Sequence, residues 1–262
     1  MRTILLDLDD TLVPDHSDFL AAVDETAAAL GAPAEMSAAV RARAQQRWRE
    51  AAAETTLRMT DISSWESLWA PFPADLRSWA DGHRLGVWRE ALRDCGVDDV
   101  GLARRLAESY RERRLARCAP YPEVVGVLED LRGIARLGVV TNGMEEHQRA
   151  KLDAAGLTDL FDVVVSSSVV GASKPDPRIF HFALERVSGR AADAVMVGDN
   201  PTRDIAGAQR AGLRGVWVDR NGGDDHGVVP DARVRRPGRA RGTGVVVAPA
   251  GRALLSERRS VY

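Results

Sequence analysis

The chain has 262 residues, a formal net charge of −2, 45% hydrophobic residues and 28% charged residues, the composition of a globular protein with a sizeable apolar core. It contains no run of about 20 apolar residues, so a membrane span is not expected. A strand-like run begins at residue 3 and leaves no room for a signal peptide. With only Cys95 and Cys118, no disulfide framework is expected. We therefore predict a cytoplasmic protein with reduced thiols.

The charge is unevenly distributed along the chain. Residues 231–262 hold eight arginines and two acids, a net charge of +6, which leaves −8 for the remainder. Arginines can hold nucleic-acid phosphates, but this tail lacks interleaved aromatic residues for base stacking. We therefore expect a solvated tail and no nucleic-acid partner.

The first predicted element is a buried strand over residues 3–9, because its apolar run is too short for a helix. From residue 14 to residue 119, Ala, Arg, Glu, Leu and Trp recur at helical spacing. Glycine and proline divide this stretch into predicted helices at 17–30, 37–57, 76–95 and 100–116. Five of the six tryptophans lie here, and we interpret most of them as pegs between helices.

Beyond residue 120, predicted helices and strands alternate. The predicted strands are 137–141, 161–166, 194–197 and 215–218, and the predicted helices are 123–135, 145–155, 177–187 and 202–211. Repeated helix–strand units predict an α/β fold, a doubly wound parallel sheet of the Rossmann type with helices on both faces. The first strand belongs to this sheet, so the helical stretch between them is an insertion.

These patterns divide the chain into three parts. Residues 1–13 and 119–222 form the expected α/β core, and residues 14–118 form the inserted helical domain. Residues 223–262 are rich in turn residues and arginine, and we expect an irregular basic tail with Val245–Val247 as a candidate short strand.

Three predicted strands end in polar residues. The first ends in Asp7-Leu8-Asp9-Asp10-Thr11, the second ends in Thr141-Asn142-Gly143, and the fourth leads into a loop that contains Asp199 and Asp204. The carboxyl ends of parallel strands meet at one edge of a sheet, where ligands bind. The sequence therefore predicts a cluster of carboxylates at this edge.

Clustered carboxylates repel each other, and a bound cation relieves the repulsion. An all-oxygen set without His or Cys favours Mg²⁺, which also binds phosphate oxygens. Thr141, the loop amides at Asn142 and Gly143, and Lys174 suit a phosphate group. Lys174 is one of only two lysines among 36 basic residues. The other, Lys151, lies in the middle of a predicted helix, and we expect it to be solvated.

Taken singly, each of these residues has a structural alternative. Asp204 suits the first turn of a helix, Thr141-Asn142-Gly143 suits a plain turn, and Lys174 suits the protein surface. From the residues alone these alternatives stay open.

The four segments D-L-D-D-T-L, T-N-G, S-K-P-D-P-R-I-F and G-D-N-P-T-R-D-I-A-G-A occur in this order. Together they resemble the haloacid dehalogenase superfamily, over residues 3–14 and about 118–220. The inserted helices resemble the all-helical cap of that superfamily. The region after Pro230 departs from the family pattern, in which a short strand and a final helix close the core.

The resemblance implies a role for each residue at the strand ends. Asp7 would be the nucleophile and Asp9 the general acid–base. Thr141 and Lys174 would hold the oxygens of the transferred phosphoryl group. The implied Mg²⁺ ligands are Asp7, Asp9 through its backbone carbonyl, Asp199 and Asp204. The candidate substrate-binding residues are Asn142, Gly143 and Thr11.

Asp9 distinguishes between the reactions of this superfamily. Its dehalogenases lack an acid at this position, so the resemblance implies a magnesium-dependent phosphatase that hydrolyses a small phosphorylated metabolite through an aspartyl-phosphate. The alternatives are a sugar-phosphate mutase, which often has glycine where this chain has Asp10, a dehalogenase-like member, or a non-catalytic binding module. We expect a small-molecule phosphate ester as partner, and a monomer or homodimer. Candidate residues for recognition of the leaving group are His16, Phe19, Arg58, Trp65 and Trp69.

Overall fold

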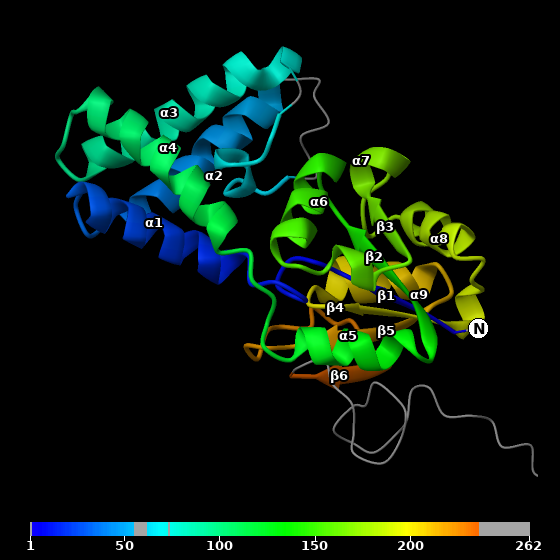
Figure 1. Cartoon of the computed structure of the whole chain (residues 1–262). Coiled ribbons are helices and arrows are strands. Elements are labelled where there is room, and N and C mark those ends of the chain that lie inside the picture. The colour runs from blue at the N-terminus through cyan, green and yellow to red at the C-terminus, as the bar shows by residue number, and fades with distance from the viewer. Residues whose placement is uncertain (1, 55–61, 73, 236–262) are drawn as a thin grey trace, which may run out of the picture. The chain divides into compact units, whose positions relative to one another are not determined.

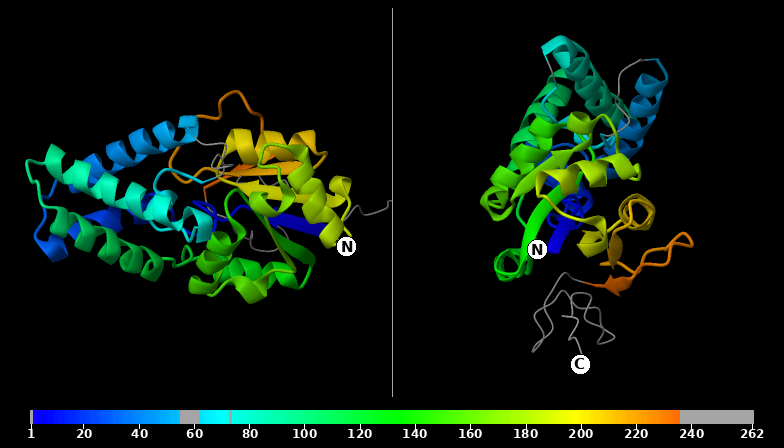
Figure 2. Two further views of the ribbon diagram at one scale, coloured as in Figure 1. Left: turned by 90° about the horizontal axis from the view of Figure 1, so that it is seen from above. Right: turned by 90° about the vertical axis from the view of Figure 1, so that its right-hand side faces the viewer.

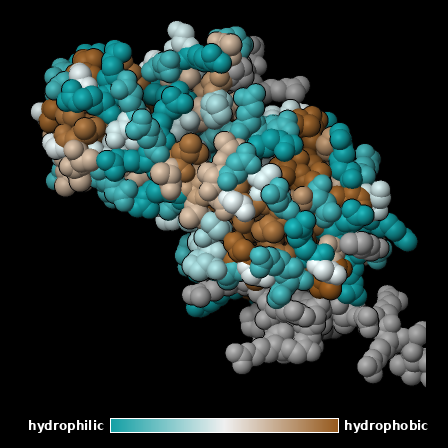
Figure 3. Space-filling model, viewed as in Figure 1, coloured by the Kyte–Doolittle hydropathy of each residue, from teal (hydrophilic) through white to brown (hydrophobic). Residues whose placement is uncertain are grey.

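The computed structural model describes residues 2–54, 62–72 and 74–235, and the chain divides into two compact units (Figure 1). The core unit consists of Met1–Pro14 and Pro120–Tyr262, and the helical unit consists of Asp15–Ala119. In the described part of the chain, no helix combines the length and apolar character that a membrane span requires. Apolar side chains on the visible surface of each unit are separated by hydrophilic ones (Figure 3).

The core unit is built on a parallel sheet of six strands in the order β3-β2-β1-β4-β5-β6. The strands are β1 (Arg2–Leu6), β2 (Ala135–Thr141), β3 (Val163–Ser166), β4 (Ala194–Gly198), β5 (Arg214–Val218) and β6 (Ala232–Val234). Helices cover both faces of the sheet (Figure 2). The predicted doubly wound α/β fold is confirmed, and the five predicted strands correspond to β1–β5.

Both faces of the sheet are buried, which explains the continuous apolar run of the first strand. The helices of the core unit are α5 (Val124–Arg132), α6 (Glu145–Ala154), α7 (Ser167–Val170), α8 (Pro177–Arg186) and α9 (Gly207–Arg210). Ile4 and Leu6 of β1 lie in an apolar cluster with residues of α5 and α6. Leu5, which points the other way, lies in a cluster with residues of α8 and α9. Because successive side chains of β1 pack into apolar clusters on opposite faces, β1 is held in the middle of the sheet.

Strand β6 lies inside the stretch that the sequence predicted to be irregular. It pairs in parallel with β5, and Ala232 and Val234 are buried. Arg233 between them pairs with Asp219 at 2.6 Å and lies over the Trp217 ring. The prediction was wrong for these three residues because a strand this short has almost no sequence pattern. The candidate strand at 245–247 lies outside the described residues.

The predicted helix at 202–211 differs from the structure in its first turns. Pro201–Ala206 forms a π-helical turn, and α9 follows it directly. Asp204 lies in this turn, and its Oδ2 atom accepts a hydrogen bond from the Asn200 backbone N–H at 2.9 Å. Such turns are rare and are frequent at functional sites, and this one directs Asp204 toward the end of β4.

The helical unit packs four helices around an apolar centre. They are α1 (His16–Leu30), α2 (Met36–Glu54), α3 (Arg77–Asp94) and α4 (Val100–Ala116). Trp69 and Trp88 are buried in this centre, as predicted for tryptophan pegs, and Trp88 lies 5.4 Å from the Tyr110 ring. Gly31 ends α1 in the left-handed conformation that glycine adopts without strain.

One buried ion pair connects the two ends of the helical unit. Arg114 of α4 pairs with Asp15, which precedes α1, and both side chains are almost fully buried. Asp15 also accepts a hydrogen bond from Trp65 Nε1 at 2.7 Å, and the Arg114 guanidinium lies 4.8 Å from the Trp69 ring centre. Trp65 and Trp69, candidates for substrate recognition, therefore have structural contacts within the unit.

We expect Arg114→Met to destabilise the helical unit by about 3–5 kcal/mol, because it leaves the buried Asp15 carboxylate without its charged partner. Urea unfolding followed by tryptophan fluorescence measures the effect. The control is Arg113→Met, which removes a half-buried arginine whose Nε donates to Ser109 Oγ at 3.2 Å, and which should cost below about 1 kcal/mol. Equal losses in the two variants would contradict the assignment.

Candidate active site

The polar residues that follow β1 and β4 lie side by side because these strands are neighbours in the sheet. The backbone N–H of Asp7 donates to the carbonyl of Val197 at 2.9 Å, which continues the strand pairing past the end of β1. Asp7 is buried and Asp204 is fully buried. The predicted meeting of carboxylates at this edge is therefore observed.

Lys174 lies between two of these carboxylates. Its Nζ atom is 2.6 Å from Asp7 Oδ1 and 2.8 Å from Asp204 Oδ1, and the side chain is buried. The backbone of Lys174 is held by Asn142, whose Oδ1 accepts from the Lys174 N–H at 2.8 Å and whose Nδ2 donates to the Lys174 carbonyl at 3.1 Å. These contacts exclude the surface-lysine alternative and join the loops that follow β2 and α7.

Asp7, Asp199 and Asp204 form a group that could hold a metal ion. One oxygen of each lies within 4.8 Å of the others. Asp204 fits closely over Gly198, where a Cβ atom would overlap the Asp204 carboxylate. Oδ1 of Asp204 lies 2.8 Å from Lys174 Nζ, so its partner in the described structure is a cation. This oxygen is suited to ligate a cation.

The electrostatics of this group also favour a cation. Burial raises the pKa of Asp7 to about 6, with Lys174 opposing the shift and Asp204 adding to it. Burial, Asp204 and Asp7 together raise the pKa of Asp199 well above its ordinary value. Burial lowers the pKa of Lys174, but Asp204 and Asp7 outweigh burial and raise it above its ordinary value. Three carboxyls thus face one ammonium, and the oxygen donors suit a hard divalent ion.

Thr141, Asn142 and Gly143 follow β2 at the same edge. Thr141 is buried, and its hydroxyl donates to the Asn142 carbonyl at 3.3 Å. The Gly143 N–H donates to Ser167 Oγ at 2.9 Å, and a Cβ at Gly143 would meet the Gln148 side chain. In this structure the Asn142 side chain and the Gly143 N–H hold neighbouring loops. Their contact with substrate stays a prediction.

The segment after Asp7 forms a tight turn. Asp9 and Val13 pair as a bridge, and Asp10 at the bend has φ 57°. Thr11 is fully buried, and its hydroxyl donates to Asp199 Oδ1 at 3.5 Å, so it faces a carboxylate, and its predicted substrate contact stays a prediction. Arg220 donates to the carbonyls of Asp10 and Thr11, which stabilises the turn.

Comparison with known proteins decides the family. The sequence profile of the haloacid dehalogenase-like hydrolases matches residues 1–212. The chain belongs to this family.

Two relatives of known activity match almost the whole chain. A phosphoserine phosphatase of Thermus thermophilus is 41% identical, over 89% of this chain and 95% of its own length. A glyceraldehyde 3-phosphate phosphatase of Methanopyrus kandleri is 30% identical, over 90% of this chain and 94% of its own length. These relatives place the chain on the phosphatase branch of the haloacid dehalogenase-like hydrolases.

The fold has counterparts among solved structures of this family. A magnesium-bound putative hydrolase from Bacillus subtilis, YfnB, superposes with a TM-score of 0.63. The match covers 90% of this chain and 94% of that chain at 23% identity, and it supports the fold alone.

Lys151 was missed by the sequence reasoning, which expected it to be solvated. Its side chain has 0% exposure, and Nζ lies 2.8 Å from Asp9 Oδ1. His147, Gln148 and Leu152, on the same face of α6, are buried as well. Lys151 lies outside the four family segments. Its rarity in an arginine-rich chain was the signal in the sequence that could have found it.

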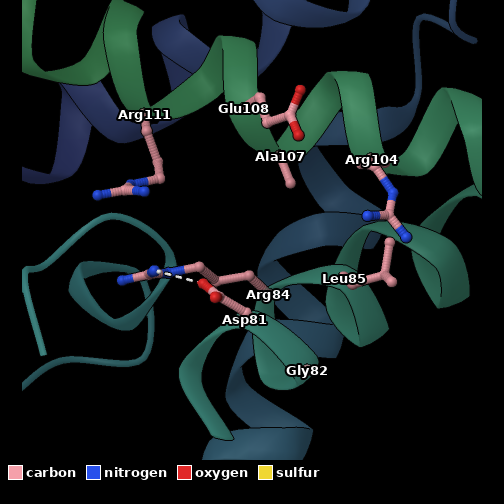
Figure 4. A pocket seen from close by; sticks show the side chains of 8 residues that line it. All are labelled: Asp81, Gly82, Arg84, Leu85, Arg104, Ala107, Glu108 and Arg111. Carbon is pink, nitrogen blue, oxygen red and sulfur yellow. Dashed lines mark hydrogen bonds and ion pairs between the residues drawn. The ribbon is translucent and has the colours of Figure 1, made fainter. Parts of the chain in front are cut away.

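A cavity of about 410 Å³ lies in the helical unit, between α3 and α4 (Figure 4). Its lining is polar and rich in arginine: Asp81, Gly82, Arg84, Leu85, Arg104, Ala107, Glu108 and Arg111. Arg84 is buried, and burial followed by the charge of Arg111 lowers its pKa to about 10. Arg84 Nε donates to the Ser67 carbonyl at 3.3 Å, so it helps to hold the loop before α3.

We expect Mg²⁺ affinity to fall as the pH drops through 6, because the metal must then displace a proton from Asp7, whose pKa is raised to about 6. The apparent Kd should rise about tenfold between pH 7 and pH 5 and change little between pH 7 and pH 8. Isothermal titration calorimetry measures it. Asp199→Asn should weaken binding strongly, and Asp159→Asn, at an exposed acid far along the chain, should not. A Kd that is the same at pH 5 and pH 7 would contradict this.

Proposed function

We propose that the chain hydrolyses the phosphate monoester of a small metabolite with the help of Mg²⁺, by way of an aspartyl-phosphate on Asp7. The observation that carries this proposal is the buried contact of Lys174 with both Asp7 and Asp204. This contact brings together the proposed nucleophile Asp7, the Lys174 ammonium and the proposed metal ligand Asp204 at one edge of the sheet. The relatives of known activity, which are phosphatases, support the same reaction.

In the first step, a carboxylate oxygen of Asp7 attacks the phosphorus atom. The bond from phosphorus to the ester oxygen breaks as the bond to Asp7 forms. Burial disfavours the ionised form of Asp7 and raises its pKa, and the neighbouring Lys174 ammonium opposes that shift. Thr141 and Lys174 are suited to hold the oxygens of the transferred group, because one ends β2 and the other lies beside Asp7.

Asp9 supplies the proton transfers. Protonated Asp9 gives its proton to the leaving oxygen, which departs as the alcohol. The resulting carboxylate then takes a proton from the water that attacks the aspartyl-phosphate, and phosphate is released. A dehalogenase, whose leaving group is a halide, has no use for this acid.

The fit of a metal rests on the donor set described above. Asp7, Asp199 and Asp204, with the Asp9 carbonyl, would hold Mg²⁺, which supplies positive charge to the phosphoryl oxygens. Within the protein, Asn200 and Gly198 orient Asp204 for this role, and Thr11 orients Asp199.

The substrate we favour is an alkyl phosphate with further charged groups, of which phosphoserine is the first to test. The reason is the full-length similarity to a phosphoserine phosphatase. We further propose that residues 1–13 and 119–222 act as the catalytic core and residues 14–118 as the cap that selects the leaving group. The groups required for the chemistry all come from the core unit.

We expect Asp7→Asn to reduce phosphate release by more than about 10³-fold, because the amide is a poor nucleophile. Phosphate release is measured with phosphoserine, glyceraldehyde 3-phosphate and p-nitrophenyl phosphate in the presence of Mg²⁺. The control variant is Asp159→Asn, which should keep the wild-type rate. Retention of a tenth of the wild-type rate by folded Asp7→Asn would exclude Asp7 as nucleophile.

Asp9→Asn should lower kcat/KM for an alkyl phosphate by about 10²–10⁴-fold and should affect p-nitrophenyl phosphate far less. The alkoxide needs a proton as it departs, whereas nitrophenolate is stable without one. The ratio kcat/KM is used because it reports the steps up to the first irreversible one and excludes hydrolysis of the phosphoenzyme. Equal losses on both substrates would mean that Asp9 acts mainly through its carbonyl.

A further inference from the structure

Lys151 and Asp9 form an ion pair with unequal burial. The Lys151 side chain is 0% exposed and the Asp9 side chain 23% exposed, and their atoms Nζ and Oδ1 lie 2.8 Å apart. A buried ammonium is strongly destabilising unless it is paired. The pair joins two segments 142 residues apart in the chain, so it is a feature of the tertiary structure.

The position of Lys151 is set by a rigid element. Helix α6 begins at Glu145, two residues after Gly143, and Gln148, one turn before Lys151, donates to the Asn142 carbonyl at 3.1 Å. Leu152, next to Lys151, belongs to the apolar cluster under the sheet. The ammonium is therefore anchored on a helix, whereas Asp9 lies in a turn, where its backbone pairs with Val13 as a bridge.

Lysine is also the less expected basic residue at this position. Only two of the 36 basic residues are lysines, and both are buried and paired with two of the three acids of the first segment, Lys174 with Asp7 and Lys151 with Asp9. A guanidinium binds both oxygens of a carboxylate, whereas an ammonium is a point charge that can bind one. Each of these two ammonium groups accordingly contacts Oδ1 of its partner acid.

We propose that Lys151 is a positioning residue, which binds Oδ1 of Asp9 and leaves Oδ2 to exchange the proton with the leaving group and then with water. This proposal rests on the proposed function. In it, the proton moves from Asp9 Oδ2 to the ester oxygen, and a water proton later returns to Oδ2. Lys151 keeps its own protons and its charge throughout.

The kinetic test compares Lys151→Met with Lys151→Arg and with the packing control Leu152→Met. Lys151→Met should lower kcat/KM for phosphoserine, or for the best alkyl phosphate found, by about 10–100-fold, a part of what a general acid supplies. It should change p-nitrophenyl phosphate by less than about threefold, with KM nearly constant. Lys151→Arg should recover most of the loss, and Leu152→Met should leave both substrates near wild type. If Lys151→Met does not fold, Lys151→Gln takes its place.

A double-variant cycle tests whether Lys151 acts through Asp9. Lys151→Met should add almost nothing to the loss already caused by Asp9→Asn, because both remove the same function. The proposal would be overturned if the losses of Lys151→Met and Asp9→Asn multiplied in the double variant. It would also be overturned if Lys151→Met lost equal activity on both substrates, or if Leu152→Met lost as much as Lys151→Met.

A structural measurement separates this proposal from the proposed function. Crystal structures of wild type and Lys151→Met, both with Mg²⁺, should show the Asp9 carboxyl in one orientation in the first and displaced or split in the second. An unchanged, single Asp9 conformer in Lys151→Met would overturn the positioning role, whatever the enzyme hydrolyses. A displaced Asp9 in a protein without phosphatase activity would overturn the proposed function alone.

Discussion

The structure depends on the repulsion between carboxylates at one edge of the parallel sheet. Asp7, Asp199 and Asp204 are crowded there with Lys174 as the neighbouring cation, and burial makes the ionised state of Asp7 and Asp199 harder to maintain. Such a group is unstable in isolation and gains from a divalent ion or an electrophilic phosphorus atom. The burial and crowding of these carboxylates, which oppose folding, are thus the features that favour a bound cation at this edge.

The surrounding structure serves to maintain this arrangement. Gly198 makes room for the Asp204 carboxylate, and the π-helical turn directs it there. Both polar atoms of the Asn142 side chain form hydrogen bonds with the backbone of Lys174. Since these contacts are made within the core unit, a substitution in any of them should disturb the site before it disturbs the fold.

The two units use their basic residues differently. In the helical unit, Arg114 holds Asp15 in a buried pair and stacks on Trp69, which suits the broad, planar guanidinium. In the core unit, lysines occupy the positions beside Asp7 and Asp9. In the helical unit both oxygens of Asp15 are bonded, one to Arg114 and the other to Trp65, which makes this carboxylate part of the architecture.

The sequence by itself determined the α/β fold, strands β1–β5 and the meeting of the carboxylates that follow β1 and β4, because apolar runs are local and parallel strands end at one edge. For Asp204 and Lys174 the residues alone left structural alternatives open, and the four family segments pointed to the site. Only the tertiary structure decided the environment of Lys151, since a mid-helix lysine has the same local pattern whether it faces solvent or an acid 142 residues away. It also decided β6, whose three residues gain their structure from the open edge of β5. Local pattern specifies elements, whereas the partner of a buried charge is specified by packing between distant segments.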